Sequence, residues 1–355
     1  MFTTEATDKV AASSHRSALR KALFLLLRVA IGIAILVYLA KSGQINLSSL
    51  IRLSHAWPIT VTAVGFLLLD ILLMSIRASL LFRSARLSLS MWNSVQLNLI
   101  GFLFSTFLPG AAGGDIAKLV YATRENHGRR AEVATVLILD RLAGLFSLVV
   151  LPLLFAPSFP DLLRSVPVLR RLLYMDALLA GLMLVGAALV MFFTPTRSWV
   201  TWLLDRWPGI KGLALRVLDT MAVHGKAQAT MLYVFLLSLL ANLALIVVTA
   251  LGVYAVNPIS FSIRLALVAP IGHLVNSLPL TPGGIGIGET AFNALFKLTG
   301  ISGGAETLLC VRLWNVLVSL LGLVVYLFGM RRSVYPYEYE SGEAGAGCIE
   351  AESTN

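Results

Sequence analysis

The sequence predicts an all-α polytopic membrane protein with about eight spanning helices and two broken or re-entrant helical segments in a pseudo-symmetric, inverted repeat. The chain of 355 residues is 57% hydrophobic and only 13% charged, whereas about a quarter of the residues in a soluble domain are charged. It contains several apolar stretches of about 20 residues, long enough to cross a hydrocarbon core about 30 Å thick. Because these stretches are continuously apolar and do not alternate in polarity, they exclude an outer-membrane β-barrel.

Eight stretches are predicted to span the membrane: about 22–40, 59–81, 93–108, 134–155, 174–193, 230–253, 263–279 and 311–329. Residues 1–21 are predicted to form a basic cytoplasmic tail, residues 22–330 a single integral-membrane domain, and residues 331–355 a disordered acidic tail. The first span lacks the short core and cleavage site of a signal peptide. Residues 194–229 mix tryptophans with basic side chains, which fits an interfacial amphipathic helix or a solvated loop equally well.

The net charge of +10 is spread over short loops between the spans. This distribution follows the positive-inside rule and does not indicate a nucleic-acid partner. Two cysteines and five separated histidines form no disulfide framework and no metal-binding pattern. We therefore expect no metal and no cofactor. The expected location is a bacterial plasma or inner membrane, with both termini cytoplasmic.

Two semi-apolar segments, about residues 109–123 and 280–300, resemble each other. The two segments and their flanking residues read "STFLPGAAGGDIAKLVYATRENHG" and "VNSLPLTPGGIGIGETAFNALFKLTG". In both, three residues separate a Leu-Pro pair from a Gly-Gly pair. An arginine follows the second glycine of each pair by 27 residues (Arg141) or 28 residues (Arg312). The predicted helix-breaking residues are Pro109, Gly113, Gly114, Pro279, Pro282, Gly283, Gly284 and Gly286.

Non-helical backbone cannot face lipid, so these breaks are expected to line a cavity or to be packed in protein. Broken helices at matching positions of two halves are typical of a transporter's binding site. Each segment can either return to the side it came from or complete a crossing. The basic stretch "RENHGRR" and the loop 194–229 favour a crossing, which is expected to place both on the cytoplasmic side and to run the repeats in opposite directions.

Charged side chains inside a span cost about 2.5–3.5 kcal/mol on insertion scales, so they mark candidate sites. Asp140 and Arg141 are adjacent and point about 100° apart on a helix, so each needs a partner from another segment. Asp70 and Arg77 share a helix face and are expected to pair with each other. The candidate substrate-binding residues are Asn98, Asp115, Lys118, Asp140, Arg141, Asn276, Glu289 and Arg312.

Arginines at a cavity, together with the amide groups of helix N-termini, suit an anion such as a lipid phosphate. Asn98 and Asn276 would hydrogen-bond neutral head-group atoms. Asp115 and Glu289 would bind a cationic group, cap a half-helix or carry protons. The stretch "GGIGIGE" lacks the strand and the βαβ unit that a dinucleotide fingerprint requires.

At these residues the chain resembles the lysylphosphatidylglycerol synthase transmembrane-region family, also called flippase-like membrane proteins. The resemblance rests on "FLPGAAGGDIAKLVYATRENHG", "VLILDRLAGL", "LPLTPGGIGIGETAFNALFKLTG" and "VRLWN", within residues 22–330. Lys118 stands where many relatives have arginine, which keeps the charge but loses bidentate geometry. Bifunctional members carry a soluble domain that moves a lysyl group from tRNA to phosphatidylglycerol. The tail of about 25 residues here is too short for a domain, so the resemblance implies the lipid-translocating half alone.

The leading hypothesis is a transporter, not an enzyme, that moves a polar-headed lipid, of anionic phospholipid type or aminoacylated, across the inner membrane. Its expected partners are membrane lipids, with a separate lipid synthase as a second candidate partner. No Walker A motif is present for ATP coupling. An intramembrane lipid-modifying transferase is a second hypothesis, although no activated nucleophile or histidine base lies close in sequence to the carboxylates. A scaffold subunit for a separate lipid synthase is the third.

Overall fold

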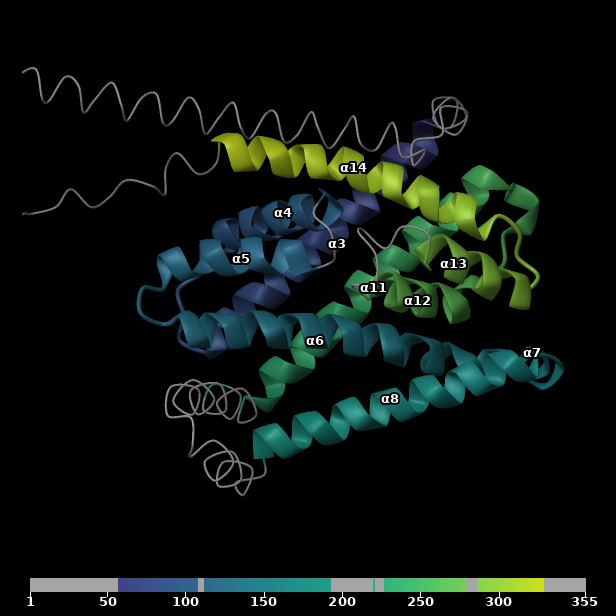
Figure 1. The fold of residues 1–355 in the computed structure, drawn as a ribbon, viewed down its shortest axis with the longest axis horizontal. Helices are drawn as coiled ribbons and strands as arrows, with labels where there is room; N and C mark the ends of the chain where they lie inside the picture. The colour runs from purple at the N-terminus through teal and green to yellow at the C-terminus, as the bar shows by residue number, and fades with distance from the viewer. Residues whose placement is uncertain (1–56, 108–111, 193–219, 221–226, 279–286, 329–355) are drawn as a thin grey trace, which may run out of the picture.

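The computed structural model describes residues 57–107, 112–192, 220, 227–278 and 287–328, in which all regular structure is helical (Figure 1). The helices are α3 (Trp57–Ser84), α4 (Met91–Phe107), α5 (Ala112–Glu125), α6 (Arg130–Phe155), α7 (Pro160–Ser165), α8 (Pro167–Phe192), α11 (Gln228–Val256), α12 (Leu265–Asn276), α13 (Ile287–Leu298) and α14 (Gly304–Phe328), with short 3-10 turns η1 (Ala156–Ser158) and η2 (Pro258–Ser260). Five helices in the described residues, α3, α6, α8, α11 and α14, are long and apolar enough to cross a membrane. The all-α polytopic fold class is confirmed.

Seven of the eight predicted spans overlap a described helix, and the first, 22–40, lies outside the described residues. The tails at 1–21 and 331–355 and most of the loop 194–229 also lie outside them. The predicted span 263–279 is the shorter helix α12, which has only 12 residues. At 1.5 Å per residue this helix covers about 18 Å, too little for a crossing of its own.

Helices α4 and α5 form a hairpin that enters and leaves at the same end. Ser88, before α4, donates its N–H to Asn126 Oδ1 at 2.9 Å, and its carbonyl accepts from Asn126 Nδ2 at 2.9 Å. Further in, Lys118 Nζ donates to Asn98 Oδ1 at 2.7 Å. A residue early in this segment (Ser88) contacts one late in it (Asn126), and the contact further in joins Asn98 to Lys118. The two helices are therefore antiparallel. Helix α5 therefore runs back to the end where α4 begins, which is the arrangement that the charge distribution favoured.

The second broken segment behaves in the same way. Arg264, at the start of α12, donates from Nη1 to the carbonyl of Thr299, just after α13, at 3.2 Å. Nearer the break, the rings of His273 and Phe292 meet edge to face with centroids 5.1 Å apart. Helix α13 therefore also runs back to the end where α12 begins, as the favoured arrangement predicts.

The basic stretch "RENHGRR" lies beside the basic end of α3, as the charge argument predicted. The Arg129 guanidinium donates to the backbone carbonyls of Arg86 at 2.7 Å and Ala85 at 3.2 Å. A returning hairpin thus keeps the basic turn between α5 and α6 beside the basic end of α3. Gly128, with a φ of 77°, supplies the left-handed residue of this turn.

The two halves form an inverted repeat in which α3, α4, α5 and α6 correspond to α11, α12, α13 and α14. In Figure 1 the α4–α5 hairpin enters from one end of the molecule and the α12–α13 hairpin from the other, while α6 and α14 run in opposite directions. Helix α3 packs on α11, α6 packs on α12, and α14 packs on α4. Each half therefore contributes its last helix to the hairpin of the other half.

Six of the eight predicted helix-breaking residues, Pro109, Pro279, Pro282, Gly283, Gly284 and Gly286, lie outside the described residues. The other two, Gly113 and Gly114, lie in the first turn of the short helix α5. A Cβ at Gly114 would collide with Ser105 and with the backbone of Gly101 on α4. The glycine therefore allows α5 to start directly against α4.

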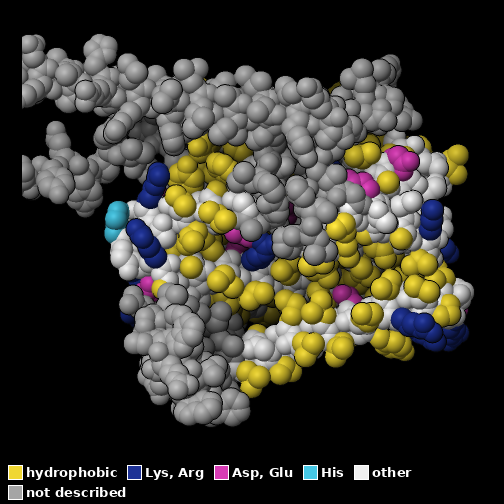
Figure 2. Space-filling view, in the orientation of Figure 1, with side chains coloured by type: hydrophobic (Ala, Val, Ile, Leu, Met, Phe, Trp, Pro, Cys, Tyr) yellow, Lys and Arg dark blue, Asp and Glu magenta, His cyan; other side chains and the backbone are white. Residues whose placement is uncertain are grey.

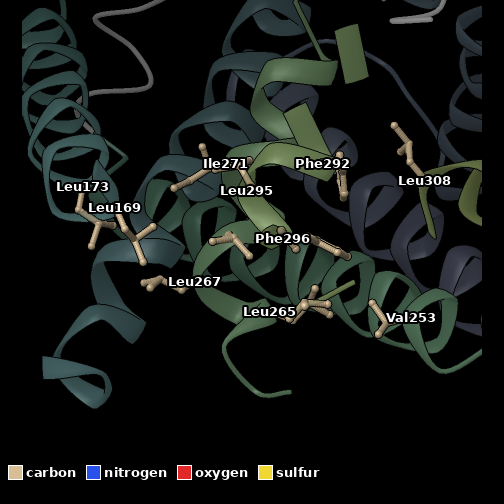
Figure 3. Close-up of a cluster of buried hydrophobic side chains, with 13 residues drawn as sticks. Leu169, Leu173, Val253, Leu265, Leu267, Ile271, Phe292, Leu295, Phe296 and Leu308 are labelled. Atoms are coloured by element: carbon tan, nitrogen blue, oxygen red, sulfur yellow. The ribbon is translucent and has the colours of Figure 1, made fainter. Parts of the chain in front are cut away.

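Two apolar clusters pack the hairpins at opposite ends of the molecule. One joins α12 and α13 to α8, α11 and α14 through Phe292 and Phe296, which are fully buried (Figure 3). The other surrounds Ala122 of α5 with side chains from α3, α4, α6 and α11. Each half-helix thus buries one apolar face in its own cluster, which fixes the orientation of its opposite face.

The outer surface is apolar between two charged ends. Figure 2 shows hydrophobic side chains over the face of α6 and α8, with Lys and Arg gathered at the two ends of this face. On α8, Tyr174, Met175 and Leu178 are more than 60% exposed, as expected for side chains that contact lipid. Asp176, between them, is turned inward and only 5% exposed.

Candidate functional site

A polar cavity of about 230 Å³ lies among α3, α4, α5, α6 and α11, where the first hairpin reaches into the bundle. Its charged lining residues are Asp70, Arg77, Asp115, Lys118, Asp140 and Arg141. Five of the eight predicted binding residues line it: Asn98, Asp115, Lys118, Asp140 and Arg141. The sequence places these residues between 98 and 141, and the hairpin brings them together in space.

Arg77 and Asp140 form the most deeply buried ion pair in the described part of the chain, with side chains 2% and 6% exposed. Arg77 Nε donates to Asp140 Oδ1 at 2.7 Å and Nη1 donates to Ser238 Oγ on α11 at 3.0 Å. The guanidinium passes Gly144 of α6, where an added Cβ would lie 3.2 Å from Nη1. This pair ties α3, α6 and α11 together.

Arg141 points to the other side of α6 and binds Asp115, in the first turn of α5. The two side chains are 33% and 41% exposed, so the pair borders open space. Asp115 is also placed where a carboxylate is stabilised by the positive end of the α5 dipole. As expected from their positions on the helix, Asp140 and Arg141 take partners from different segments.

Lys118 faces the cavity from one turn further along α5. Its Nζ donates to Asn98 Oδ1 at 2.7 Å, and Asn98 Nδ2 donates to Ser75 Oγ at 3.1 Å and to the Ser94 carbonyl at 3.0 Å. Asn98 is 3% exposed and Ser75 is fully buried. This chain of hydrogen bonds holds the ammonium at the cavity wall through neutral groups only.

The expected pairing of Asp70 with Arg77 is wrong, because Arg77 binds Asp140 on another helix. Asp70 is 9% exposed and lines the cavity. Among the described residues, no ion pair within 4.0 Å and no side-chain hydrogen bond involves its carboxylate. Asp70 is therefore a buried acid whose charge is balanced only by cations that lie beyond ion-pair distance.

The other three predicted residues form a second cluster around the second hairpin. Arg312 Nε lies 3.1 Å from Glu289 Oε1, and Arg312 Nη2 donates to Asn276 Oδ1 at 3.2 Å. Glu289 is in the first turn of α13, as Asp115 is in the first turn of α5. Both halves thus join a half-helix N-terminus to an arginine of the following span. Ser277, next to Asn276, lines the polar cavity, so the second cluster adjoins it.

An apolar cleft of about 540 Å³ runs beside the polar cavity, between α8 and the helices α3, α6 and α11. It is lined by side chains such as Leu142, Phe146, Met183 and Phe235. Ala143 lines the cleft and its neighbour Gly144 lines the polar cavity. The two spaces therefore lie on adjoining faces of α6.

Three charged or amide residues that line the cavity were not among the predicted binding residues: Asp70, Arg77 and Asn242. Asn242 of α11 lines the cavity and donates to the Gly144 carbonyl at 3.0 Å. Each of the three is a polar residue inside a predicted span, and this signal could have identified them. Asp176 of α8 has the same signal, and its Oδ2 is buried with no hydrogen-bond partner in the described residues. Within these residues, no group of three or more His, Cys, Asp or Glu side chains could hold a metal ion.

Comparison with known proteins places this architecture in a family. No curated protein and no solved structure matches the chain. The family model described as the lysylphosphatidylglycerol synthase TM region matches residues 25–331, which is most of the sequence. This range contains both hairpins, the polar cavity and the Glu289–Arg312 cluster. The chain is therefore a multi-pass membrane protein that belongs to the lysylphosphatidylglycerol synthase TM region family.

Proposed function

We propose that the protein translocates a polar-headed lipid between the leaflets of a bacterial plasma or inner membrane, with both termini on the cytoplasmic side. The observation that carries the proposal is the cavity of about 230 Å³, lined by ion pairs, inside an otherwise apolar bundle. Charged side chains at membrane depth are costly and mark the path of a polar substrate. A structural role alone would require no open space between them.

The position of the cavity supports this function. The half-helix α5 directs its N-terminus and Asp115 toward the cavity, and Arg141 lies across from it. A guanidinium and a helix N-terminus are both suited to a lipid phosphate. The adjoining apolar cleft of about 540 Å³ offers an acyl chain a place while the head group is in the cavity.

The inverted repeat supports transport over modification. Two hairpins that enter from opposite ends and meet near the middle give each leaflet an equivalent element (Figure 1). Inverted repeats of this kind alternate access by moving one half against the other around a central site. A transferase needs no such symmetry, because its substrate can enter and leave on one side.

The test uses purified protein in liposomes whose outer leaflet carries phospholipids with a fluorescent acyl chain. Exchange between leaflets is followed by quenching from outside, for the wild type, Arg141→Ala and Gly181→Ala. Gly181 is the matched control, because a Cβ there meets nothing within 4 Å. We expect exchange in the wild type and the control and none in Arg141→Ala. Equal exchange in all three, or none for any head group in the wild type, would contradict the proposal.

A further inference from the structure

We propose that the cavity selects a lipid whose head group carries one positive and one negative charge and no net charge, and that Asp70 and Lys118 recognise these two charges. The inference rests on the proposed function and specifies its substrate class. It replaces the earlier expectation of an anionic or aminoacylated lipid with a zwitterion such as a phosphoethanolamine head group. Asp70 was not a predicted binding residue.

The charges that line the cavity balance. Three carboxylates, Asp70, Asp115 and Asp140, face three cations, Arg77, Lys118 and Arg141. Two of each sign already neutralise one another in the pairs Arg77–Asp140 and Arg141–Asp115. A net anion or cation in this space would leave one charge uncompensated at low dielectric, which is strongly unfavourable. A zwitterion brings its own counter-charge.

Asp70 and Lys118 are the two charges outside those pairs. Asp70 is more than nine-tenths buried, and in the part of the chain that the structure describes its carboxylate has no ion pair and no side-chain hydrogen bond. Arg77, the cation on its own helix, is already bound to Asp140. An ammonium group of the ligand would supply the partner that the protein does not.

Lys118 provides the positive charge that would bind the negative group of the ligand. An ammonium group has three donors, and one of them goes to the neutral Asn98 side chain. A phosphate oxygen can accept from another without displacing a protein carboxylate. The lysine is held in place by the Asn98–Ser75 hydrogen bond of 3.1 Å, so its position is fixed before the ligand arrives.

The size of the cavity limits the head group. Its volume of about 230 Å³ equals the space of about eight water molecules at ~30 Å³ each. This accommodates a single phosphate with a short amine, whereas a glycan of several sugars would not fit. Charge balance and volume therefore indicate the same class of small zwitterion.

The experiment measures leaflet exchange of three lipids with identical fluorescent acyl chains: phosphatidylethanolamine (zwitterionic), phosphatidylglycerol (anionic) and a trimethylammonium lipid (cationic). Wild type should exchange phosphatidylethanolamine about tenfold faster than the other two. Asp70→Asn should shift the preference toward phosphatidylglycerol, because the cavity then carries a net positive charge. Lys118→Gln should shift it toward the cationic lipid for the opposite reason.

Retention of the same three lipids by the detergent-solubilised protein, measured by native mass spectrometry, gives a second readout that does not need transport. Opposite shifts of the two variants in either assay support the inference. Phosphatidylglycerol as the preferred wild-type lipid, or an unchanged preference in both variants, would overturn it while leaving the translocase proposal intact. Absence of exchange for all three lipids together with zwitterion-selective retention would refute translocation and keep the assignment of the site.

Discussion

Asp140 and Arg141 are neighbours in α6, yet Asp140 binds Arg77 of α3 and Arg141 binds Asp115 of α5. The first pair is almost completely buried, and the second borders open space with side chains 33% and 41% exposed. Two neighbouring residues of α6 therefore form one ion pair inside the packed bundle and one ion pair that borders open space. The two pairs should respond differently to substitution.

Arg77→Met should destabilise the protein strongly, because it leaves Asp140 buried without its partner. Breaking a buried pair in this way costs about 3–5 kcal/mol. The loss of thermal stability in detergent, followed by size-exclusion chromatography after heating, measures it. The double variant Arg77→Met/Asp140→Leu should recover much of the lost thermal stability, since no buried charge is then without a partner. A double variant no more stable than Arg77→Met would contradict this explanation.

Arg141→Ala should leave thermal stability nearly unchanged while abolishing lipid exchange. A partly exposed ion pair contributes only about 0–1 kcal/mol, so the bundle does not depend on it. Arg141→Lys should retain part of the activity, because it keeps the charge but loses the bidentate geometry. Melting and leaflet exchange on the same preparations test this. A melting temperature lowered as much as in Arg77→Met would show that Arg141 has a structural role instead.

Gly144→Ala should displace the Arg77 guanidinium, because the new Cβ would lie 3.2 Å from Nη1. Overpacking of this kind costs about 1–3 kcal/mol. Gly65→Ala on α3 is the matched control, since a Cβ there meets nothing within 4 Å. Thermal melting of both variants gives the comparison. Equal stability of the two would mean that α6 can shift away from Arg77 without cost.

Single cysteines can test the returning hairpins. In a background with Cys310 and Cys348 replaced by serine, cysteines at Arg86 and His127 should react with a membrane-impermeant maleimide from one side of the membrane. Cysteines at Ile259 and Ser302 should react from the other side. Intact and inside-out vesicles distinguish the two. Labelling of positions 86 and 127 from opposite sides would show that α4 and α5 together complete a crossing.

Hydropathy was sufficient to predict the positions of the described long helices, because a membrane span requires an apolar stretch of about 20 residues. Hydropathy alone did not decide whether each broken segment runs back beside the preceding helix, and the basic loops were needed to favour this arrangement. Both arrangements have the same apolar pattern, and the choice depends on long-range contacts such as Asn126 with Ser88, 38 residues apart. The partner of Asp140 could not be predicted from the sequence either, since Arg77 is 63 residues away. Helical geometry showed only that Asp140 and Arg141 needed different partners.

The candidate site was predicted in composition but not in arrangement. The eight selected residues fall into two groups, one lining the cavity and one around Arg312. The similarity of the two halves indicated two groups, but it gave no sign that the first group lines the polar cavity. The role of Asp70 was missed because a nearby arginine on the same helix face offered a simpler partner.

The division of the site between the halves has a consequence for the conformational cycle. The cavity is lined largely by the first hairpin and its neighbours, and the second hairpin region contributes Ser277. If the two halves exchanged conformations, as inverted repeats allow, the cavity would close around Asp115 and open around Asn276, Glu289 and Arg312. The structure would then represent one of two states related by the pseudo-two-fold axis of the repeat, and the second cluster would receive the head group on the opposite side of the membrane.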